Sequence, residues 1–236
     1  MRFKNKIVVV TGGAHGIGLA IVHAFEKEGA HVCIIDKSQN PYFVGDIGDK
    51  EVLEAFVDKV LDDYGHVDIL INNAKPSFKG LDTCSYEEFN EALRVGLSAP
   101  FYLTKLLMNH QGENPSIVNI SSSRDQQSQP QSESYSAAKG GLHALTHAMA
   151  MSLAGKARVN SVSPGWIDVN DHAYQGPDAC QHPVKRVGRC EDIASTVLFL
   201  CSEEAGFITA ENILVDGGMS HMMIYHEDHG WTYHED

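Results

Sequence analysis

The chain has 236 residues, of which 43% are hydrophobic, and its formal net charge at pH 7 is -13. This length and apolar content are sufficient for the core of one large α/β domain. The acidic balance, with no basic stripe, argues against a nucleic-acid-binding surface, and no stretch approaches the roughly 20 apolar residues of a membrane span.

The cysteines and the N-terminus indicate the compartment. The five cysteines are scattered and contain no Cys-x-x-Cys pair, which predicts neither a disulfide framework nor a zinc site. The apolar run after the basic N-terminus, residues 7–10, is too short for the core of a signal peptide. We therefore expect a cytoplasmic protein with no nucleic-acid partner and no membrane partner.

The first predicted element is a strand over residues 7–10, buried on both faces because all four side chains are apolar and β-branched. A turn with the spacing Gly12-x3-Gly16-x-Gly18 follows it and leads into apolar residues at helical spacing. Glycines let a backbone approach phosphate oxygens, and a helix N-terminus presents unpaired N–H groups. Strand, glycine turn and helix in this order predict a dinucleotide site.

The second predicted strand, residues 32–35, ends in Asp36. A carboxylate about 20 residues past the glycine turn accepts hydrogen bonds from the ribose hydroxyls of NAD and repels the 2′-phosphate of NADP. Asp36 therefore favours NAD, whereas Lys37 and His15 are nearby cations able to accommodate a phosphate.

The connection to the third candidate strand is short. Only residues 37–41 separate the second strand from residues 42–47, whereas a parallel crossover normally needs a dozen or more. The crossover helix is therefore missing, and two arrangements remain open. The third strand is short and reached by an extended crossing, or it is displaced from the sheet edge.

Helices and strands alternate along the rest of the chain. Helices are predicted at residues 50–64, 85–109 (interrupted near Gly96 and Pro100), 135–154 and 191–202, and strands at 67–71, 116–120, 158–162 and 212–215. Residues 124–134 and 167–187 are predicted loops, and we expect the second loop to shape specificity. This order predicts a single Rossmann-type α/β domain over residues 1–236, with a doubly wound parallel β-sheet flanked by helices.

Tyr135 and Lys139 are four residues apart at the start of a predicted helix, so they share one helix face. A fixed cation beside a phenol favours the phenolate and brings its pKa toward the working pH. The spacing is common by chance, and it gains meaning from the motifs around it.

Those motifs lie at strand ends and follow one another in a fixed order: Thr11-Gly12-x3-Gly16-Ile17-Gly18, Asp46-Ile47, Asn72-Asn73-Ala74, Ser122, Tyr135-x3-Lys139, Pro164-Gly165 and Asp216-Gly217-Gly218. Together they resemble the short-chain dehydrogenase/reductase (SDR) family over nearly the whole chain, to about Gly218. The resemblance implies hydride transfer between NAD(H) and an alcohol or ketone.

The resemblance also implies roles for single residues. Tyr135 would be the general acid/base, Lys139 would lower the pKa of Tyr135 and hold the nicotinamide ribose, and Ser122 would orient the substrate oxygen. Ser122 lies in a run of three serines, so a strand-end capping role is its alternative. The cofactor would be held by residues of the glycine turn and the strand ends: Gly12, His15, Gly16, Ile17, Gly18, Asp36, Asp46, Ile47, Asn73, Ala74, Tyr135, Lys139, Pro164, Gly165 and Ile167.

Three positions depart from the family pattern. Gly96 replaces the Asn that supports a water relay to the active-site Lys, so the proton path would use backbone carbonyls and an additional water, or turnover would be slow. Lys75 replaces the Gly of Asn-Asn-Ala-Gly. The Thr expected shortly after Pro-Gly is replaced around Asp168 and Val169, which removes one cofactor contact.

Lys75 and Arg124 are cations that can face the substrate side of the cleft. They suggest an anionic substrate, such as a carboxylate or a phosphate ester. The alternative is that both are solvated surface cations.

The C-terminal tail, residues 219–236, contains Tyr225, Trp231 and Tyr233. Aromatic residues at a terminus need a surface to pack on, and family members commonly form homodimers or homotetramers, so we expect the tail to lie across a neighbouring subunit. The spacing of its acidic and histidine residues fits no strong metal signature, and no metal site is predicted.

Two classes of function remain after these observations. The leading interpretation is an NAD-dependent oxidoreductase of a hydroxysteroid, polyol or hydroxy acid, with 3-oxoacyl-thioester reduction as the runner-up within the enzymes. The second class is a nucleotide-binding protein with weak or no turnover, which Gly96 and Lys75 keep open.

Overall fold

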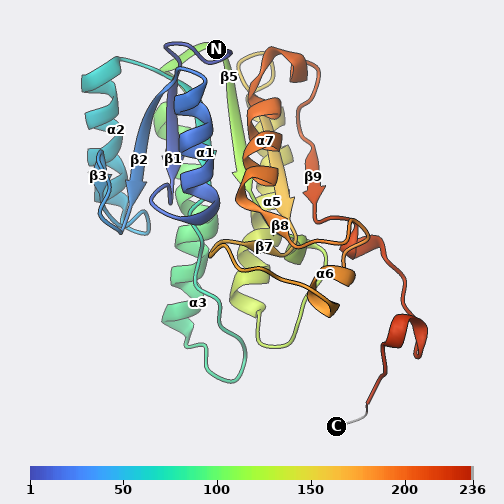
Figure 1. The fold of residues 1–236 in the computed structure, drawn as a ribbon. Helices are drawn as coiled ribbons and strands as arrows, with labels where there is room; N and C mark the ends of the chain where they lie inside the picture. Colours follow the sequence, from blue (N-terminus) through green and yellow to red (C-terminus); the bar gives the residue numbers. More distant parts are fainter. Residues whose placement is uncertain (235–236) are drawn as a thin grey trace.

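The computed structural model describes residues 1–234, so the last two residues of the expected tail, 235–236, lie outside the described residues. Seven parallel strands form one sheet (Figure 1). Their spatial order is β3 (Phe43–Val44), β2 (His31–Asp36), β1 (Ile7–Thr11), β4 (Val67–Asn72), β5 (Gln111–Ile120), β6 (Arg158–Pro164) and β9 (Asn212–Val215). The strand order reverses between β1 and β4, and a crevice for ligands is expected at the carboxyl ends of strands at such a point.

Helices cover both faces of the sheet, which confirms the doubly wound α/β fold (Figure 1). α1 (Gly16–Lys27) and α7 (Cys190–Cys201) pack on one face against Val8 and Val10. The helices of the other face are α2 (Lys50–Tyr64), α4 (Ala99–Leu107) and α5 (Glu133–Ser152). Consecutive residues of a buried strand point to opposite faces, so a run without alternation is what this two-sided core requires.

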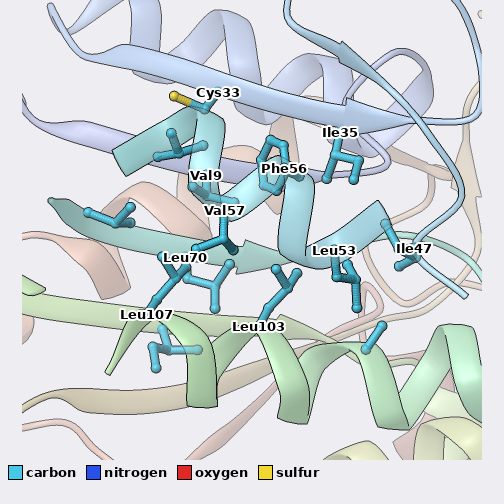
Figure 2. Packing of buried hydrophobic residues seen from close by; sticks show 14 of the residues in the cluster. Val9, Cys33, Ile35, Ile47, Leu53, Phe56, Val57, Leu70, Leu103 and Leu107 are labelled. Carbon is cyan, nitrogen blue, oxygen red and sulfur yellow. The ribbon is translucent and has the colours of Figure 1, made fainter. Parts of the chain in front are cut away.

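Figure 2 shows the core between the sheet and α2. Phe56 of α2 is fully buried and lies among Val9, Ile35 and Leu70 of the strands and Leu103 of α4. Burying a side chain of this size contributes about 1.5–3 kcal/mol to folding. This packing fixes α2 beside the sheet, although the connection between β2 and β3 that precedes it is short.

The third strand is the short strand of the two arrangements that the sequence left open. β3 has two residues, and Phe43 and Val44 pair with Ile35 and Asp36 of β2. The Asn40 side chain shapes the extended crossing, because its Oδ1 accepts from the N–H groups of Tyr42 (3.0 Å) and Phe43 (2.9 Å). The predicted strand over residues 42–47 is therefore too long.

The helical stretch from residue 86 to residue 107 is not interrupted at Pro100. Ser85 caps α3 (Tyr86–Leu93) in a capping box with Glu88, and a π-helical turn, Arg94–Ser98, joins it to α4. The expected irregularity near Gly96 is this wider turn. It precedes Pro100, which lacks an N–H to donate, and the Pro100 carbonyl accepts the Thr104 hydroxyl at 2.8 Å.

The remaining elements lie at the carboxyl edge of the sheet (Figure 1). The predicted loop over 167–187 contains β7 (Ile167–Asp168), which pairs with β8 (Gly188–Arg189), and the short helix α6 (Pro177–Cys180). Beyond β9 the tail projects away from the sheet (Figure 1). No helix among residues 1–234 is long and apolar enough to cross a membrane.

Candidate active site

A cavity of about 1110 Å³ lies at the carboxyl ends of the central strands. Every residue predicted for the cofactor and for the acid/base chemistry lines it, which brings together side chains up to 155 positions apart in the chain, from Gly12 to Ile167. The lining also contains residues that the sequence did not single out as cofactor contacts: Lys37, Pro76, Ser77, Glu91, Val95, Trp166, Val169 and Asn170 among them.

The glycine turn is pressed against the loop that follows β4. Gly12 has a φ of +66°, and a Cβ there would lie 2.8 Å from the Ala74 Cα, while a Cβ on Gly18 would lie 2.0 Å from the Gly12 carbonyl oxygen. The Asn73 side chain donates to the carbonyls of Thr11 (3.1 Å) and Gly12 (2.9 Å). Only glycine fits this approach, which leaves the α1 N-terminus open for a pyrophosphate.

Asp36 ends β2 at the rim of the cavity. Its carboxylate accepts hydrogen bonds from the N–H groups of Ala14 (3.0 Å) and Ser38 (2.8 Å), so its orientation is fixed. The Lys37 ammonium is engaged elsewhere, 2.8 Å from Asp46 and 3.7 Å from Glu91. Lys37 is therefore neutralised by two carboxylates, and the hydrogen bond to Asp46 raises its pKa.

Ser122 lies just beyond β5 and is 8% exposed. Its hydroxyl oxygen accepts the N–H of Arg124 at 3.2 Å, which caps the short turn Ser123–Asp125. Because a hydroxyl oxygen has a second lone pair and a proton to donate, this capping role leaves Ser122 able to bond a substrate oxygen.

Lys139 is buried at the first turns of α5, one turn after Tyr135. Its ammonium donates to the Ile120 carbonyl at 2.5 Å and lies 5.7 Å from the centre of the Tyr135 ring. Burial, followed by the charge of Lys75, lowers the pKa of Lys139 to about 7. A lysine in this state exchanges protons near neutral pH.

The pKa of Tyr135 shifts in the direction opposite to our expectation. Burial of the phenol raises it, and the Ser122 hydroxyl and the charge of Arg124 oppose the rise only in part. The Lys139 ammonium lies toward the ring and is bonded to a backbone carbonyl, so its geometry here does not produce the expected lowering.

Replacing the buried ammonium should stabilise the ligand-free protein. Lys139→Met is expected to raise the free energy of unfolding by about 1–3 kcal/mol at pH 6 to 7, after the lost bond to Ile120 is counted. Below pH 7 the wild-type folded state bears the full cost of a buried charge. That cost falls as the pH rises from about 7 toward the ordinary pKa of 10.5. Urea unfolding near pH 6 and near pH 9.5 measures how the difference in free energy of unfolding between the variant and wild type decreases with pH. A wild type more stable than the variant near pH 6 would contradict the prediction.

Gly96 lies in the π-helical turn, next to Ala138 of α5 and to Pro76, which lines the cavity. A Cβ there would lie 2.8 Å from the Ala138 Cβ and 3.0 Å from the Pro76 ring. Pro76 and Ala138 therefore fill the space in which a side chain at position 96 would lie. The chain therefore has no side chain at the position where the family pattern places the relay Asn, and no room for one.

Gly96→Ala should destabilise the fold by about 1–3 kcal/mol, because the added methyl overlaps two packed neighbours. Gly140→Ala in α5 is the matched control: its Cβ would meet only the Asp125 carbonyl, at 3.9 Å, and it should be neutral or stabilising by up to about 1 kcal/mol. Equal unfolding midpoints for the two variants in urea would show that the space at Gly96 is open.

A buried carboxylate that the sequence did not single out holds the site together. Asp125 accepts hydrogen bonds from Ser163 (2.9 Å) and Asn212 (3.0 Å), and its Oδ2 lies 3.0 Å from His143. It thus ties the Ser122 turn to β6, to β9 and to α5. The available signal was the position of His143, one turn after Lys139 on the same helix face.

The Thr position that departs from the family pattern is filled by a local turn. Asp168 accepts the Asn170 N–H at 2.9 Å and lies 3.3 Å from His172. A Cβ on Gly16 would lie 3.3 Å from the Val169 side chain, so Val169 covers the glycine turn with an apolar group.

The parallel sheet, the glycine turn and the strand-end cavity define a nucleotide-binding α/β protein. A family model described as enoyl-(acyl carrier protein) reductase matches residues 12–220. The chain belongs to the short-chain dehydrogenase/reductase family, and it is an NAD(P)-dependent oxidoreductase that acts on alcohol or ketone substrates.

Two relatives and one solved structure illustrate the similarity. An uncharacterized oxidoreductase of Thermotoga maritima is 37% identical, over 95% of this chain and 99% of its own. The L-fucose dehydrogenase of Mus musculus is 33% identical, over 92% of this chain and 89% of its own. An apo SCOR enzyme from Clostridium thermocellum superposes with a TM-score of 0.90 at 42% identity, covering 98% of this chain and 99% of its own.

Proposed function

We propose that this protein transfers a hydride between NAD(H) and the carbon of a CH–OH or C=O group through Ser122, Tyr135 and Lys139. The observation that carries the proposal is that the three side chains and the glycine turn line the same cavity. The nicotinamide cofactor supplies or accepts the hydride when bound.

The residues of the chain account for the accompanying proton. In oxidation, Tyr135 would pass its phenol proton to the neutral form of Lys139 as it accepts the substrate hydroxyl proton, while Ser122 holds the same oxygen by a hydrogen bond. Lys139, with a pKa of about 7, can pass or take a proton at neutral pH. Its bond to the Ile120 carbonyl keeps it at one position beneath the phenol. Reduction uses the same groups in reverse.

The route by which the proton leaves Lys139 differs from the family pattern. Gly96 offers no side chain, and Pro76 and Ala138 close the space beside it. The Lys139 ammonium is bonded to the Ile120 carbonyl and also faces the cavity, where Lys75 contributes charge. These are the two directions that remain for the proton. We infer that water in the cavity carries the proton.

The experiment is a screen of alcohols, sugars, hydroxy acids and ketones with NAD and NADP, read at the absorbance of reduced nicotinamide. Tyr135→Phe should lower kcat by about 10²–10⁴-fold on any substrate found, because the proton exchange is lost. Its binding of NAD should stay within a few-fold of wild type. A variant with unchanged kcat would remove Tyr135 from the mechanism.

NAD preference over NADP is the second part of the proposal, and it rests on Asp36 and Lys37. Asp36 is fixed by two N–H donors at the β2 end, while Lys37 is paired with Asp46 and Glu91 and so offers no free charge to a 2′-phosphate. The Asp36 carboxylate would bond the ribose hydroxyls.

Asp36→Ala should reduce NAD affinity by about tenfold and bring the affinities for NAD and NADP close together, because the carboxylate both binds one cofactor and repels the other. Isothermal titration of each cofactor measures this without turnover. Glu51→Gln is the control, since it removes an exposed carboxylate of α2 that does not line the cavity, and it should change the ratio much less. An unchanged ratio in Asp36→Ala would contradict the assignment.

Reduction of a 3-oxoacyl thioester is the alternative activity. The 3-oxoacyl-[acyl-carrier-protein] reductase FabG of Thermotoga maritima is 31% identical to this chain, so the screen includes 3-oxoacyl thioesters. A nucleotide-binding protein with weak turnover is the other alternative. The closed space at Gly96 favours it, and cofactor binding without any turnover across the screen would select it.

We further propose that residues 1–236 form one domain that assembles as a homodimer or homotetramer in the cytoplasm. The exposed aromatic residues of the tail support assembly: Tyr225 is 67%, Trp231 46% and Tyr233 61% exposed in the single chain. Exposed aromatic residues close together in the chain are a surface on which a partner subunit can pack. The five cysteines are all free thiols, as in a reducing compartment.

A further inference from the structure

Arg124 lies beside the reacting groups and has unused hydrogen-bonding capacity. Its Nη1 is buried and has no hydrogen-bond partner among the described residues. Its Nη2 donates to the side-chain oxygen of Gln129, and its backbone N–H donates to the Ser122 hydroxyl at 3.2 Å. The guanidinium is thus two residues from Ser122 and attached to the same turn.

Phe78 links this guanidinium to Tyr135. The Arg124 Cζ lies 4.8 Å from the centre of the Phe78 ring, and that ring lies 5.3 Å from the centre of the Tyr135 ring. The charge is close enough to lower the pKa of Tyr135 against the effect of burial. Arg124 therefore lies close to a substrate that is held by Ser122 and Tyr135, and it can attract an anionic group on that substrate.

No acidic side chain of the described chain neutralises Arg124. Among residues 1–234 it forms no ion pair within 4 Å, although the chain has 31 acidic residues against 18 basic ones. The Oδ2 of its neighbour Asp125 is bonded to Ser163, Asn212 and His143, and Asp125 forms no ion pair with Arg124 among the described residues. Lys75, on the cavity side of Tyr135, likewise forms no ion pair in the described part of the chain.

A buried donor without a hydrogen-bond partner costs folding free energy. Gln129, which holds the other nitrogen, is exposed and offers a neutral oxygen. A carboxylate in its place would bond both nitrogens of the planar guanidinium at once, and such charge-assisted pairs are roughly twice as strong as neutral ones.

We propose that the substrate carries a carboxylate, which displaces Gln129 and binds Nη1 and Nη2 of Arg124 while its hydroxyl or carbonyl is held by Ser122 and Tyr135. The substrate class is therefore a hydroxy acid or its oxo acid. This inference rests on the proposed oxidoreductase function, and it assigns Arg124 as a specificity residue. Lys75 contributes longer-range attraction at the cavity rim.

The test compares binding and turnover for hydroxy acids and their matched neutral amides, using 3-hydroxybutyrate, lactate and mandelate with the corresponding amides. Binding is measured by calorimetry on the full protein loaded with NAD, and turnover by the absorbance of reduced nicotinamide. In wild type, at least one acid should bind about tenfold or more tightly than its amide. Arg124→Gln should remove this difference while leaving the affinity for the amide within about threefold.

Three further variants separate charge recognition from a structural effect. Lys156→Gln removes an exposed charge just beyond the far end of α5 and should not change the acid-to-amide ratio. Gln129→Ala should leave carboxylate binding equal or tighter, because it removes the competing acceptor. Arg124→Lys keeps the charge without the planar fork and should recover part of the preference.

The outcomes distinguish failure of the carboxylate assignment from failure of the proposed oxidoreductase function. Equal affinities for acids and amides in wild type, or a preference that survives in Arg124→Gln, would overturn the carboxylate assignment even if neutral alcohols are turned over. Tighter binding of glycerol 3-phosphate than of any acid, lost in Arg124→Gln, would overturn it in favour of a phosphate. Carboxylate binding that needs Arg124, without turnover of any substrate, would support the inference while contradicting the oxidoreductase function.

Discussion

The burial of the Lys139 ammonium beneath Tyr135 is the interaction on which the site depends. A charged group in this position costs free energy, and among residues 1–234 its backbone acceptor is the Ile120 carbonyl at the end of β5. The bond couples the first turns of α5 to the end of β5. It holds the phenol, the ammonium and the Ser122 turn in one frame, and the same burial brings the Lys139 pKa to about 7.

A second buried charge supports this frame from behind. Asp125 joins the Ser122 turn to β6, β9 and α5 through hydroxyl, amide and imidazole partners. Such a carboxylate is stable only because its Oδ2 is bonded several times over. The acid/base groups therefore sit on elements held in place by polar bonds as well as by the apolar cores on both faces of the sheet.

The departures from the family pattern change the surroundings of these groups more than the groups themselves. Pro76 and Ala138 occupy the space beside Gly96, and Lys75 adds a positive charge on the cavity side of Lys139. Arg124 adds another on the side of Phe78. Two cations therefore lie near the Tyr135 and Lys139 pair in a protein whose overall charge is strongly negative, a contrast that would attract an anionic ligand to this cleft.

The sheet, its two-sided core and the group of residues at the strand ends could all be predicted from local patterns of residues. Unbroken β-branched runs followed by glycine, Asp, Asn, Ser or Pro-Gly are local signals, and parallel topology brings their ends to one edge. The length of β3 and the continuity of the helix through Pro100 do not follow from local sequence patterns. The first depends on the Asn40 side chain and the second on a widened helical turn. The direction of the Tyr135 pKa shift, the Asp125 network and the lack of a partner for Arg124 Nη1 among residues 1–234 could not be predicted in this way. Burial and hydrogen-bond partners are set by packed neighbours that are distant in the chain.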